Sequence, residues 1–163
     1  MEPNRAQEQY FFDEATVAFL GRNLAAYAHP CCLCCPLPGQ WLAQQGHRAT
    51  ILDTDRRFQT VVGYRYYDLH APTWLGDDFG IILCDPPFFN VSLRELEHAI
   101  RMLARYDYAQ PLVLCYLERR EAALLRVFAR YGLRPTDKVL GYQDVTPKAK
   151  NRIVLYTNVE LLR

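Results

Sequence analysis

The sequence predicts an α/β domain in which a mostly parallel sheet is covered by helices on both faces. Short apolar runs typical of buried strands alternate along the chain with longer segments whose apolar residues recur at helical spacing. Three of the strand-like runs also end at an aspartate, and parallel strands bring their carboxyl ends to one edge of a sheet. With 163 residues the chain has the length of one domain, so we expect residues 1–163 to form a single unit.

The first half of the chain predicts two helices and three strands. Asp13 is a favourable N-cap, and the apolar residues after it recur at helical spacing as far as Tyr27. We expect this helix to end near His29 and Pro30. The other elements expected here are a strand over 31–35 closed by Pro36, a short helix over 40–45, a strand over 49–52 that ends at Asp53, and a weaker strand over 61–67 that meets Asp68.

The second half predicts four strands and two helices. Ser92 and Glu95 form a capping box for a helix whose apolar stripe begins at Leu93. Gly132 is expected to stop the second helix. The remaining elements are strands over 81–84 and 111–117, a helix over 118–131, and two antiparallel closing strands over 139–142 and 153–159, with Lys148, Lys150 and Arg152 in or beside their connection.

Four of the six cysteines crowd the first predicted strand, beside His29: Cys31, Cys32, Cys34 and Cys35. A structural zinc site draws paired ligands from two separated places, and this sequence has no second pair. Alternation along a strand would also send the second and third of the four away from the first and fourth. Cys84 and Cys115 lie in other buried strands, so we expect reduced, buried thiols and no metal.

Composition narrows the partners and the location. The formal net charge of +1 gives no broad attraction to nucleic acid, so any such contact would have to be local. No stretch approaches the ~18 uninterrupted apolar residues of a membrane span. Residues 1–9 are polar and lack the apolar core of a signal peptide. We therefore expect an intracellular, cytoplasmic protein without a membrane partner.

The most informative stretch is Ile81–Phe89. Its apolar strand ends at Asp85, and Pro86 and Pro87 keep the following chain stiff and extended. Because neither proline has an N–H, the turn exposes carbonyl acceptors. An acid, fixed carbonyl oxygens and the ring of Phe88 together suit a group that donates hydrogen bonds, such as an amine. The alternative interpretation is a simple turn that ends a strand.

Asp53 and Asp68 are candidates for nucleotide recognition. In nucleotide-binding α/β sheets an acid at the end of the second strand commonly accepts the ribose hydroxyls, and Asp53 stands in that place. Asp68 follows the next strand and could accept a hydrogen bond from an adenine amine. Both residues are equally consistent with ordinary turns or caps.

Asp85-Pro86-Pro87-Phe88 after an apolar strand resembles the D/N-P-P-Y/F motif of S-adenosylmethionine (SAM)-dependent amino methyltransferases. More closely, the chain is similar to the probable N6-adenine methyltransferases. That family includes eukaryotic lysine methyltransferases of translation elongation factor 1-alpha and is akin to zinc-knuckle ribosomal RNA adenine methyltransferases. The resemblance runs from about Gln9 to Glu160, and its other parts are Gln9–Phe12, Cys31–Pro36, Asp53–Phe58 and Tyr67-Asp68.

The resemblance implies a Rossmann-like class I SAM-dependent methyltransferase fold whose last strand is antiparallel. It places the cofactor SAM across the carboxyl ends of the strands, near Phe11, Phe12, Pro36, Asp53 and Asp68. The sequence departs from the fold's usual glycine motif after the first strand, where it has Cys-Pro-Leu-Pro-Gly with Gly39 as its one glycine. Glycines there allow the backbone to approach the ligand closely, so this departure concerns the detailed cofactor contacts.

The resemblance also implies a catalytic turn of Asp85, Pro86, Pro87 and Phe88, and three functions are compatible with it. The acceptor would be the N6 amine of adenine in RNA or DNA, or the side-chain amine of a protein lysine. The third possibility is a catalytically weak protein that binds only a cofactor or a partner. The basic residues that could form a local phosphate track are Arg56, Arg57, Lys148, Lys150 and Arg152.

Overall fold

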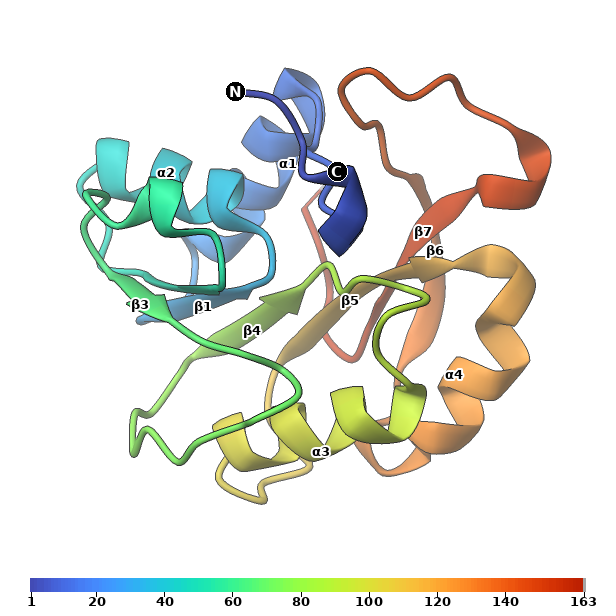
Figure 1. Ribbon diagram of the computed structural model, residues 1–163. Coiled ribbons are helices and arrows are strands. Elements are labelled where there is room, and N and C mark those ends of the chain that lie inside the picture. Colours follow the sequence, from blue (N-terminus) through green and yellow to red (C-terminus); the bar gives the residue numbers. More distant parts are fainter. Residues whose placement is uncertain (163) are drawn as a thin grey trace.

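A computed structural model describes residues 1–162, and a seven-stranded sheet runs through its centre (Figure 1). Its strands are β1 Pro30–Leu33, β2 Thr50–Asp53, β3 Tyr64–Tyr66, β4 Ile81–Cys84, β5 Leu112–Leu117, β6 Arg134–Val139 and β7 Ile153–Thr157. Their order across the sheet is β3-β2-β1-β4-β5-β7-β6. The first five are parallel, and β7 is antiparallel to both β5 and β6. Arg163, the last residue of the expected domain, lies outside the described residues.

Helices cover both faces of this sheet, as predicted. The longer helices are α1 Glu14–Leu24, α2 Pro36–Gln44, α3 Leu93–Leu103 and α4 Glu121–Val127. Short 3-10 turns are η1 Arg5–Gln7, η2 Arg56–Phe58, η3 Glu118–Arg120, η4 Ala129–Tyr131 and η5 Ala149–Asn151. Figure 1 shows α1 and α2 on one side and α3 and α4 on the other.

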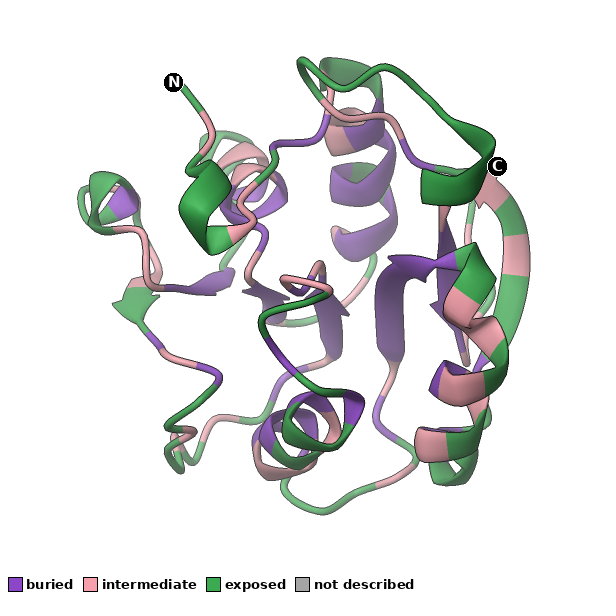
Figure 2. Cartoon of the chain, turned by 45° about the vertical axis from the view of Figure 1, so that its right-hand side comes forward, coloured by how far each residue is buried: buried purple, intermediate pink, exposed green. Residues whose placement is uncertain are grey.

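Two apolar clusters fill the space between the helices and the sheet. Leu20 of α1 and Leu42 of α2 belong to one cluster, and Leu96 of α3 and Leu124 of α4 belong to the other. Strands covered on both faces are apolar at every position rather than alternating. Accordingly, β1, β2, β4 and β5 are buried throughout, as the purple strands in Figure 2 show. None of the helices of residues 1–162 is long and apolar enough to cross a membrane.

The predicted helix caps are confirmed. The Asp13 side chain accepts a hydrogen bond from the Thr16 backbone at 2.8 Å. Ser92 and Glu95 form a complete capping box at the start of α3, with bonds of 2.8 and 3.1 Å. Because the N-cap Ser92 lies five residues after Pro87, this cap fixes the distal end of the turn that follows β4.

Several predicted boundaries are wrong. α1 ends at Leu24 rather than near His29. Tyr27 continues the helical spacing of apolar residues in the sequence, but it lies in a turn after the helix and packs on the same apolar cluster as α1. α2 begins at Pro36 rather than at residue 40, since proline is tolerated at the first helical position. The helix expected over 118–131 divides into η3, α4 and η4.

The strand expected over 139–142 is also wrong. β6 lies earlier, over Arg134–Val139, and its sequence is largely polar because it is an exposed edge strand. The chain then leaves the sheet, and Tyr142 forms an isolated antiparallel bridge with Phe12. The antiparallel pairing of the two closing strands is confirmed.

The cysteine alternation differs from the expectation at both Cys34 and Cys35. Cys34 lies just beyond β1 with φ of 59°, so the strand alternation stops before it. Cys31 and Cys34 therefore pack toward one cluster, and Cys32 and Cys35 belong to the other. All six thiols are free.

Candidate active site

Asp85 immediately follows β4 at the place where the strand order reverses. β1 has β2 on one side and β4 on the other, and the Asp85 N–H donates to the Leu33 carbonyl oxygen at 3.2 Å. Crevices at such switch points, outside the carboxyl ends of parallel strands, are the usual ligand sites of open α/β sheets. The sequence-predicted turn thus lies at the position where a ligand is expected.

A cavity of about 70 Å³ lies at this switch point. Its floor and walls come from the ends of β1, β2 and β4 and from the loop after β6, and its roof is the segment Gln7–Tyr10. The lining residues are Gln7, Glu8, Gln9, Tyr10, Cys34, Asp53, Thr54, Asp85, Pro86, Pro87, Phe88 and Tyr142. None of these side chains is a lysine or an arginine, so the cavity's acids have no cationic partner within it.

Asp53 ends β2 and is 6% exposed. One of its carboxylate oxygens accepts the Asp55 N–H at 2.8 Å. Burial raises the pKa of Asp53 to about 6, against the backbone N–H groups of Asp55 and Thr54, which lower it. A buried carboxylate with spare acceptor capacity suits a ligand that brings hydroxyl donors.

Asp85 is partly buried, and its side chain lines the cavity. Its Oδ1 accepts a hydrogen bond from the Tyr142 hydroxyl at 2.9 Å. Burial raises the pKa of Asp85 well above its ordinary value, and the Tyr142 hydrogen bond opposes that rise. No donor among residues 1–162 bonds its Oδ2.

Hydrogen bonds and a ring contact hold the rest of the turn in place. The Pro87 carbonyl oxygen accepts the Val91 N–H at 3.3 Å, and Arg120 donates to the Phe88 carbonyl oxygen at 3.0 Å. The Phe88 ring meets Tyr116 edge-on, with centroids 5.6 Å apart. Within the described chain, nothing donates to the Pro86 carbonyl oxygen, so this turn presents a free backbone acceptor beside the Asp85 carboxylate.

The pKa of the Cys34 thiol is affected by all three acids at the strand ends, so these acids lie close to one another. Burial raises the pKa of this thiol well above the ordinary value, and the charges of Asp53, Asp85 and Asp68 raise it further. The prediction that these acids meet at one rim is therefore confirmed. Asp68 itself does not line the cavity, and its carboxylate accepts the His70 N–H at 2.9 Å.

The missing glycine motif has a structural explanation. Cys34 takes the left-handed conformation that glycine usually supplies, and α2 starts two residues later. Gly39 lies inside α2, where a Cβ would collide with the Ile51 side chain of β2. Gly39 therefore serves helix–sheet packing rather than close approach of the backbone to a ligand.

Three other predicted cofactor residues do not line the cavity. Phe11 and Phe12 are 4% and 2% exposed, and Pro36 is buried at the start of α2. The Phe11 ring packs on Phe58, with centroids 6.0 Å apart, and the Phe12 ring packs on Tyr142 at 4.9 Å. Their direct contact with a cofactor stays a prediction, and in this structure Phe12 packs against Tyr142, which lines the cavity.

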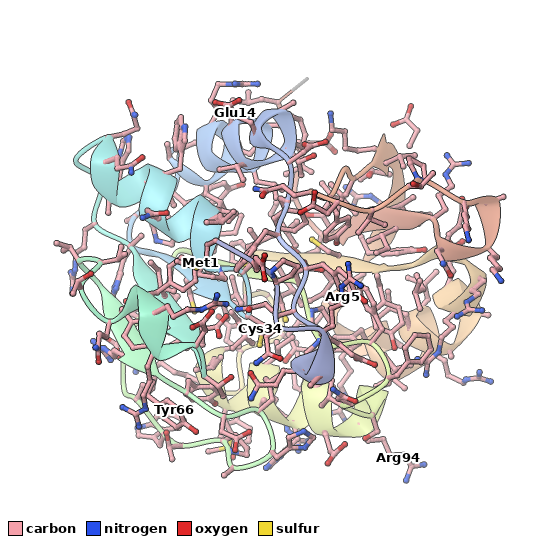
Figure 3. All side chains as sticks on the ribbon, turned by 45° about the horizontal axis from the view of Figure 1, so that its top comes forward. Met1, Arg5, Glu14, Cys34, Tyr66 and Arg94 are labelled. Carbon is pink, nitrogen blue, oxygen red and sulfur yellow. The ribbon has the colours of Figure 1, made fainter. Side chains whose placement is uncertain are left out.

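Sequence reasoning missed the roof. The Glu8 carboxylate accepts the N–H groups of Phe89 and Asn90 at 2.9 and 3.2 Å. On the other side, Gln9 bonds both Asp55 and Arg57 at 2.8 Å. The segment thus bridges the turns after β2 and β4, and Figure 3 shows Met1 and Arg5 over the same end of the sheet as Cys34. Glu8 and Gln9 belong to no sequence pattern that signals such a bridge.

A second hollow of about 590 Å³ adjoins the turn on its outer side. Aromatic and aliphatic side chains form most of its wall, including Phe88, Phe89 and Tyr142, which come from the turn and from the loop after β6. Lys148 and Arg152 also line it. We call this hollow the outer groove. Phe88 and Tyr142 line both the cavity and the outer groove, so they separate the two spaces.

The strand order with one antiparallel strand and the acid-Pro-Pro turn at its switch point define a Rossmann-like methyltransferase. The TehB-like SAM-dependent methyltransferase of Corynebacterium glutamicum ATCC 13032 Kitasato has a TM-score of 0.60 at 19% identity, over 91% of this chain and 89% of that chain. For the magnesium protoporphyrin IX methyltransferase ChlM of Synechocystis PCC 6803 with bound SAM, the TM-score is 0.58 at 18% identity, over 90% and 77%. These similarities confirm the predicted fold class.

The family follows from the sequence itself. The family model for probable N6-adenine methyltransferases matches residues 3–161, and the chain belongs to this family. The T. thermophilus 16S rRNA N2 G1207 methyltransferase RsmC, in complex with AdoMet and guanosine, has a similar fold with a TM-score of 0.52 at 12% identity, over 98% of this chain and 44% of that chain. No curated protein matches significantly.

The hydrogen-bond acceptors of the cavity fit SAM, and the volume of the cavity is small for this ligand. Asp53 offers a buried acceptor for ribose hydroxyls, and Asp85 and the Pro86 carbonyl offer acceptors on the opposite wall. Pockets for ligands of this size typically hold about 300–1,000 Å³. The 70 Å³ beneath Gln7–Tyr10 is smaller than this range, and hydrogen bonds join the roof to the turns after β2 and β4.

Proposed function

We propose that this protein is a SAM-dependent N-methyltransferase whose acceptor is the N6 amine of adenine in nucleic acid. The observation that carries the proposal is Asp85, a partly buried carboxylate at the switch point with one free oxygen and a free backbone carbonyl beside it. Membership of the family supports methyl transfer, and the family's name supports the adenine amine.

Asp53 would hold the ribose of SAM through the hydroxyl groups, in keeping with its place at the end of β2. Bound SAM supplies an electrophilic methyl group on a sulfonium sulfur. The absence of cations among the cavity's lining residues favours a positively charged ligand there. The roof segment Gln7–Tyr10 would exclude water once it closes over the site.

The turn would bind the acceptor amine by its hydrogens. An exocyclic adenine amine is a poor nucleophile because its lone pair is delocalised into the ring. Hydrogen bonds from its two N–H groups to Asp85 Oδ2 and the Pro86 carbonyl oxygen would help to localise that pair. They would also stabilise the positive charge that develops on nitrogen as the methyl group transfers. Phe88 would stack on the base and orient it.

Access to this turn favours an unpaired or flipped base. Phe88 separates the enclosed cavity from the outer groove, so a base must enter singly. Phe89 is 65% exposed and has the Arg119 guanidinium 5.7 Å above its ring. Such an aromatic–arginine pair is typical of stacking surfaces for single strands. Lys148 and Arg152 of the outer groove would meet phosphates.

One observation favours a protein lysine as the second candidate acceptor. The wall of the outer groove is mainly apolar and aromatic, which suits the aliphatic stem of lysine, and the chain's net charge is only +1. A lysine amine would also have to lose a proton before it reacts. Arg56, which was expected to belong to a local phosphate track, favours neither acceptor. Its guanidinium lies over the Tyr66 ring at 4.5 Å, and Arg56 does not line the outer groove.

The test is incubation with radiolabelled SAM and a cell extract, followed by separate nuclease and protease digestion of the labelled product. Nuclease-sensitive label in N6-methyladenine supports the proposal, and protease-sensitive label supports the lysine alternative. Absence of label, with SAM binding intact, would support the non-catalytic alternative.

A substitution at Asp85 links the reaction to this site. Asp85→Ala should lower kcat at least ~100-fold, by analogy with loss of one preorganised polar group, and leave the Kd for SAM within a few-fold. Asp85→Asn keeps one acceptor oxygen and should retain partial activity. Asp137→Ala, on the exposed strand β6, is the control. Full activity in Asp85→Ala would refute the assigned role.

A further inference from the structure

Tyr142 is the one side chain of residues 1–162 that bonds the Asp85 carboxylate. Its hydroxyl donates to Asp85 Oδ1 at 2.9 Å, which leaves Oδ2 without a partner. Tyr142 comes from the loop after β6, 57 residues away in sequence, so no local motif places it beside the turn. It also lines both the cavity and the outer groove.

The backbone around Tyr142 is clamped to the start of α1 rather than free with its loop. The Asp13 N–H donates to the Gly141 carbonyl oxygen at 2.9 Å, and the Gln143 N–H donates to the Phe11 carbonyl oxygen at 2.7 Å. The Gly141 N–H reaches the Thr16 hydroxyl at 3.1 Å. A side chain at 141 would collide with the Asp13 carboxylate, so this close approach requires glycine.

The ring of Tyr142 is supported as firmly as its backbone. It packs on Phe12 at a centroid distance of 4.9 Å, and Phe12 is 2% exposed within the cluster beneath α1. The hydroxyl therefore reaches Asp85 from a rigid base. This arrangement gives the aromatic pair Phe11-Phe12 a role that does not depend on direct contact with a cofactor.

We propose that Tyr142 is a positioning residue for methyl transfer: its hydroxyl fixes the Asp85 carboxylate so that Oδ2 faces the acceptor amine. This inference rests on the proposed function. Occupation of Oδ1 removes the rotational freedom of the carboxylate and limits it to one acceptor hydrogen. The second hydrogen of the amine then goes to the Pro86 carbonyl oxygen.

The same hydrogen bond favours the form of Asp85 that accepts hydrogen bonds. A protonated carboxyl would donate a hydrogen bond rather than accept one, and burial favours that neutral form. The Tyr142 hydroxyl stabilises the ionised form and thus lowers the pKa of Asp85 against the effect of burial. Without the hydroxyl, a higher pH would be needed to ionise the carboxyl.

The other groups around Asp85 do not replace this donor. They are Cys34 at the end of β1, Cys84 on β4, Cys115 on β5, Asp53 on β2 and Glu8 on the roof. The acids among them accept hydrogen bonds when ionised and so do not supply a donor, and the thiols remain neutral because burial raises their pKa.

The decisive experiment titrates the Asp85 carboxyl by carbon-13 NMR in the intact protein and in Tyr142→Phe, with Asp85→Asn to assign the signal. We expect the Asp85 pKa to rise in Tyr142→Phe. The acid limb of the kcat profile should shift to higher pH by the same amount, with the Kd for SAM unchanged. Tyr156→Phe is the matched control, since it removes another buried tyrosine hydroxyl, one without a partner within residues 1–162.

The outcomes separate the two proposals. An Asp85 pKa that is the same in Tyr142→Phe as in the wild type overturns the positioning role, whatever the activity. A shifted pKa with an unshifted kcat profile overturns it as well, because the carboxylate would then not limit turnover. A wild-type protein that binds SAM but methylates no acceptor would instead overturn the proposed function, while the titration still measures what Tyr142 does to Asp85.

Discussion

At the scale of single residues, Asp53 combines binding chemistry with a cost to stability. Its pKa is about 6 in the folded protein against an ordinary 3.8, because burial penalises the charged form. The folded state therefore holds this proton more tightly than the unfolded state. The associated stability is fully present below pH 3.8 and is lost as the pH rises through 6. A shift of this size corresponds to about 3 kcal/mol.

Asp53→Asn keeps the shape and removes the charge. At pH 8 we expect the free energy of unfolding to rise by about 1–3 kcal/mol relative to the wild type, and at pH 4 we expect much less difference. The same variant should bind SAM more weakly at pH 8, because a neutral amide is a poorer acceptor for hydroxyl groups. Urea denaturation and calorimetry measure the two effects. An unchanged SAM affinity would show that the ribose assignment is wrong.

At the scale of elements, the cap of α3 fixes the end of the catalytic turn. Ser92→Ala removes the hydrogen bond to the Glu95 N–H and should lower the free energy of unfolding by about 1 kcal/mol. Ser92→Thr retains the hydroxyl and serves as the control. Urea denaturation of the three proteins checks this prediction, and equal midpoints would contradict it.

The roof should behave as a gate for SAM. Glu8→Ala removes two hydrogen bonds to the turn after β4, both on the exposed side of the molecule. We expect SAM to associate several-fold faster in stopped-flow binding, with a change in stability of about 1 kcal/mol or less. Glu2→Ala is the control, because the contact of Glu2 with Arg57 uses its backbone carbonyl. Identical association rates in all three proteins would show that the roof does not limit entry.

The sequence predicted best those elements whose apolar pattern along the chain matches their burial in the structure. Buried strands such as β4 and β5 appear as apolar runs, and the Ser92 and Asp13 caps have short-range signals. β6 was misplaced because an exposed edge strand carries no apolar pattern. Cys34 and Cys35 lie on the opposite sides from those predicted, because the positive φ of Cys34 breaks an alternation that only holds inside a strand.

At the scale of the whole molecule, the site was predictable only where the contributing residues end neighbouring parallel strands. Asp53 and Asp85 meet because β2, β1 and β4 are adjacent, which the α/β pattern already implied. Tyr142 lies 57 residues after its partner Asp85 in the sequence, and Glu8 lies 81 residues before its partner Phe89. Both nevertheless reach the same site. Such contacts depend on the packing of the chain ends around the sheet, which has no local signature.

The low net charge of the whole molecule provides a test that distinguishes the two candidate acceptors. With a net charge of +1, binding to nucleic acid depends on a few local contacts. Of the two basic residues that line the outer groove, Arg152 is paired with Glu118, and Lys148 has no ion pair in the described chain. If RNA binds there, Lys148→Gln should reduce the slope of log Kd against log salt by about 0.7, the effect of one phosphate contact on a single strand. Arg22→Gln, on the exposed side of α1, should leave the slope unchanged. Fluorescence anisotropy with a labelled single-stranded RNA at several salt concentrations measures both. A flat dependence for the wild type would argue against the adenine acceptor and favour the lysine, because a peptide acceptor releases no condensed counterions.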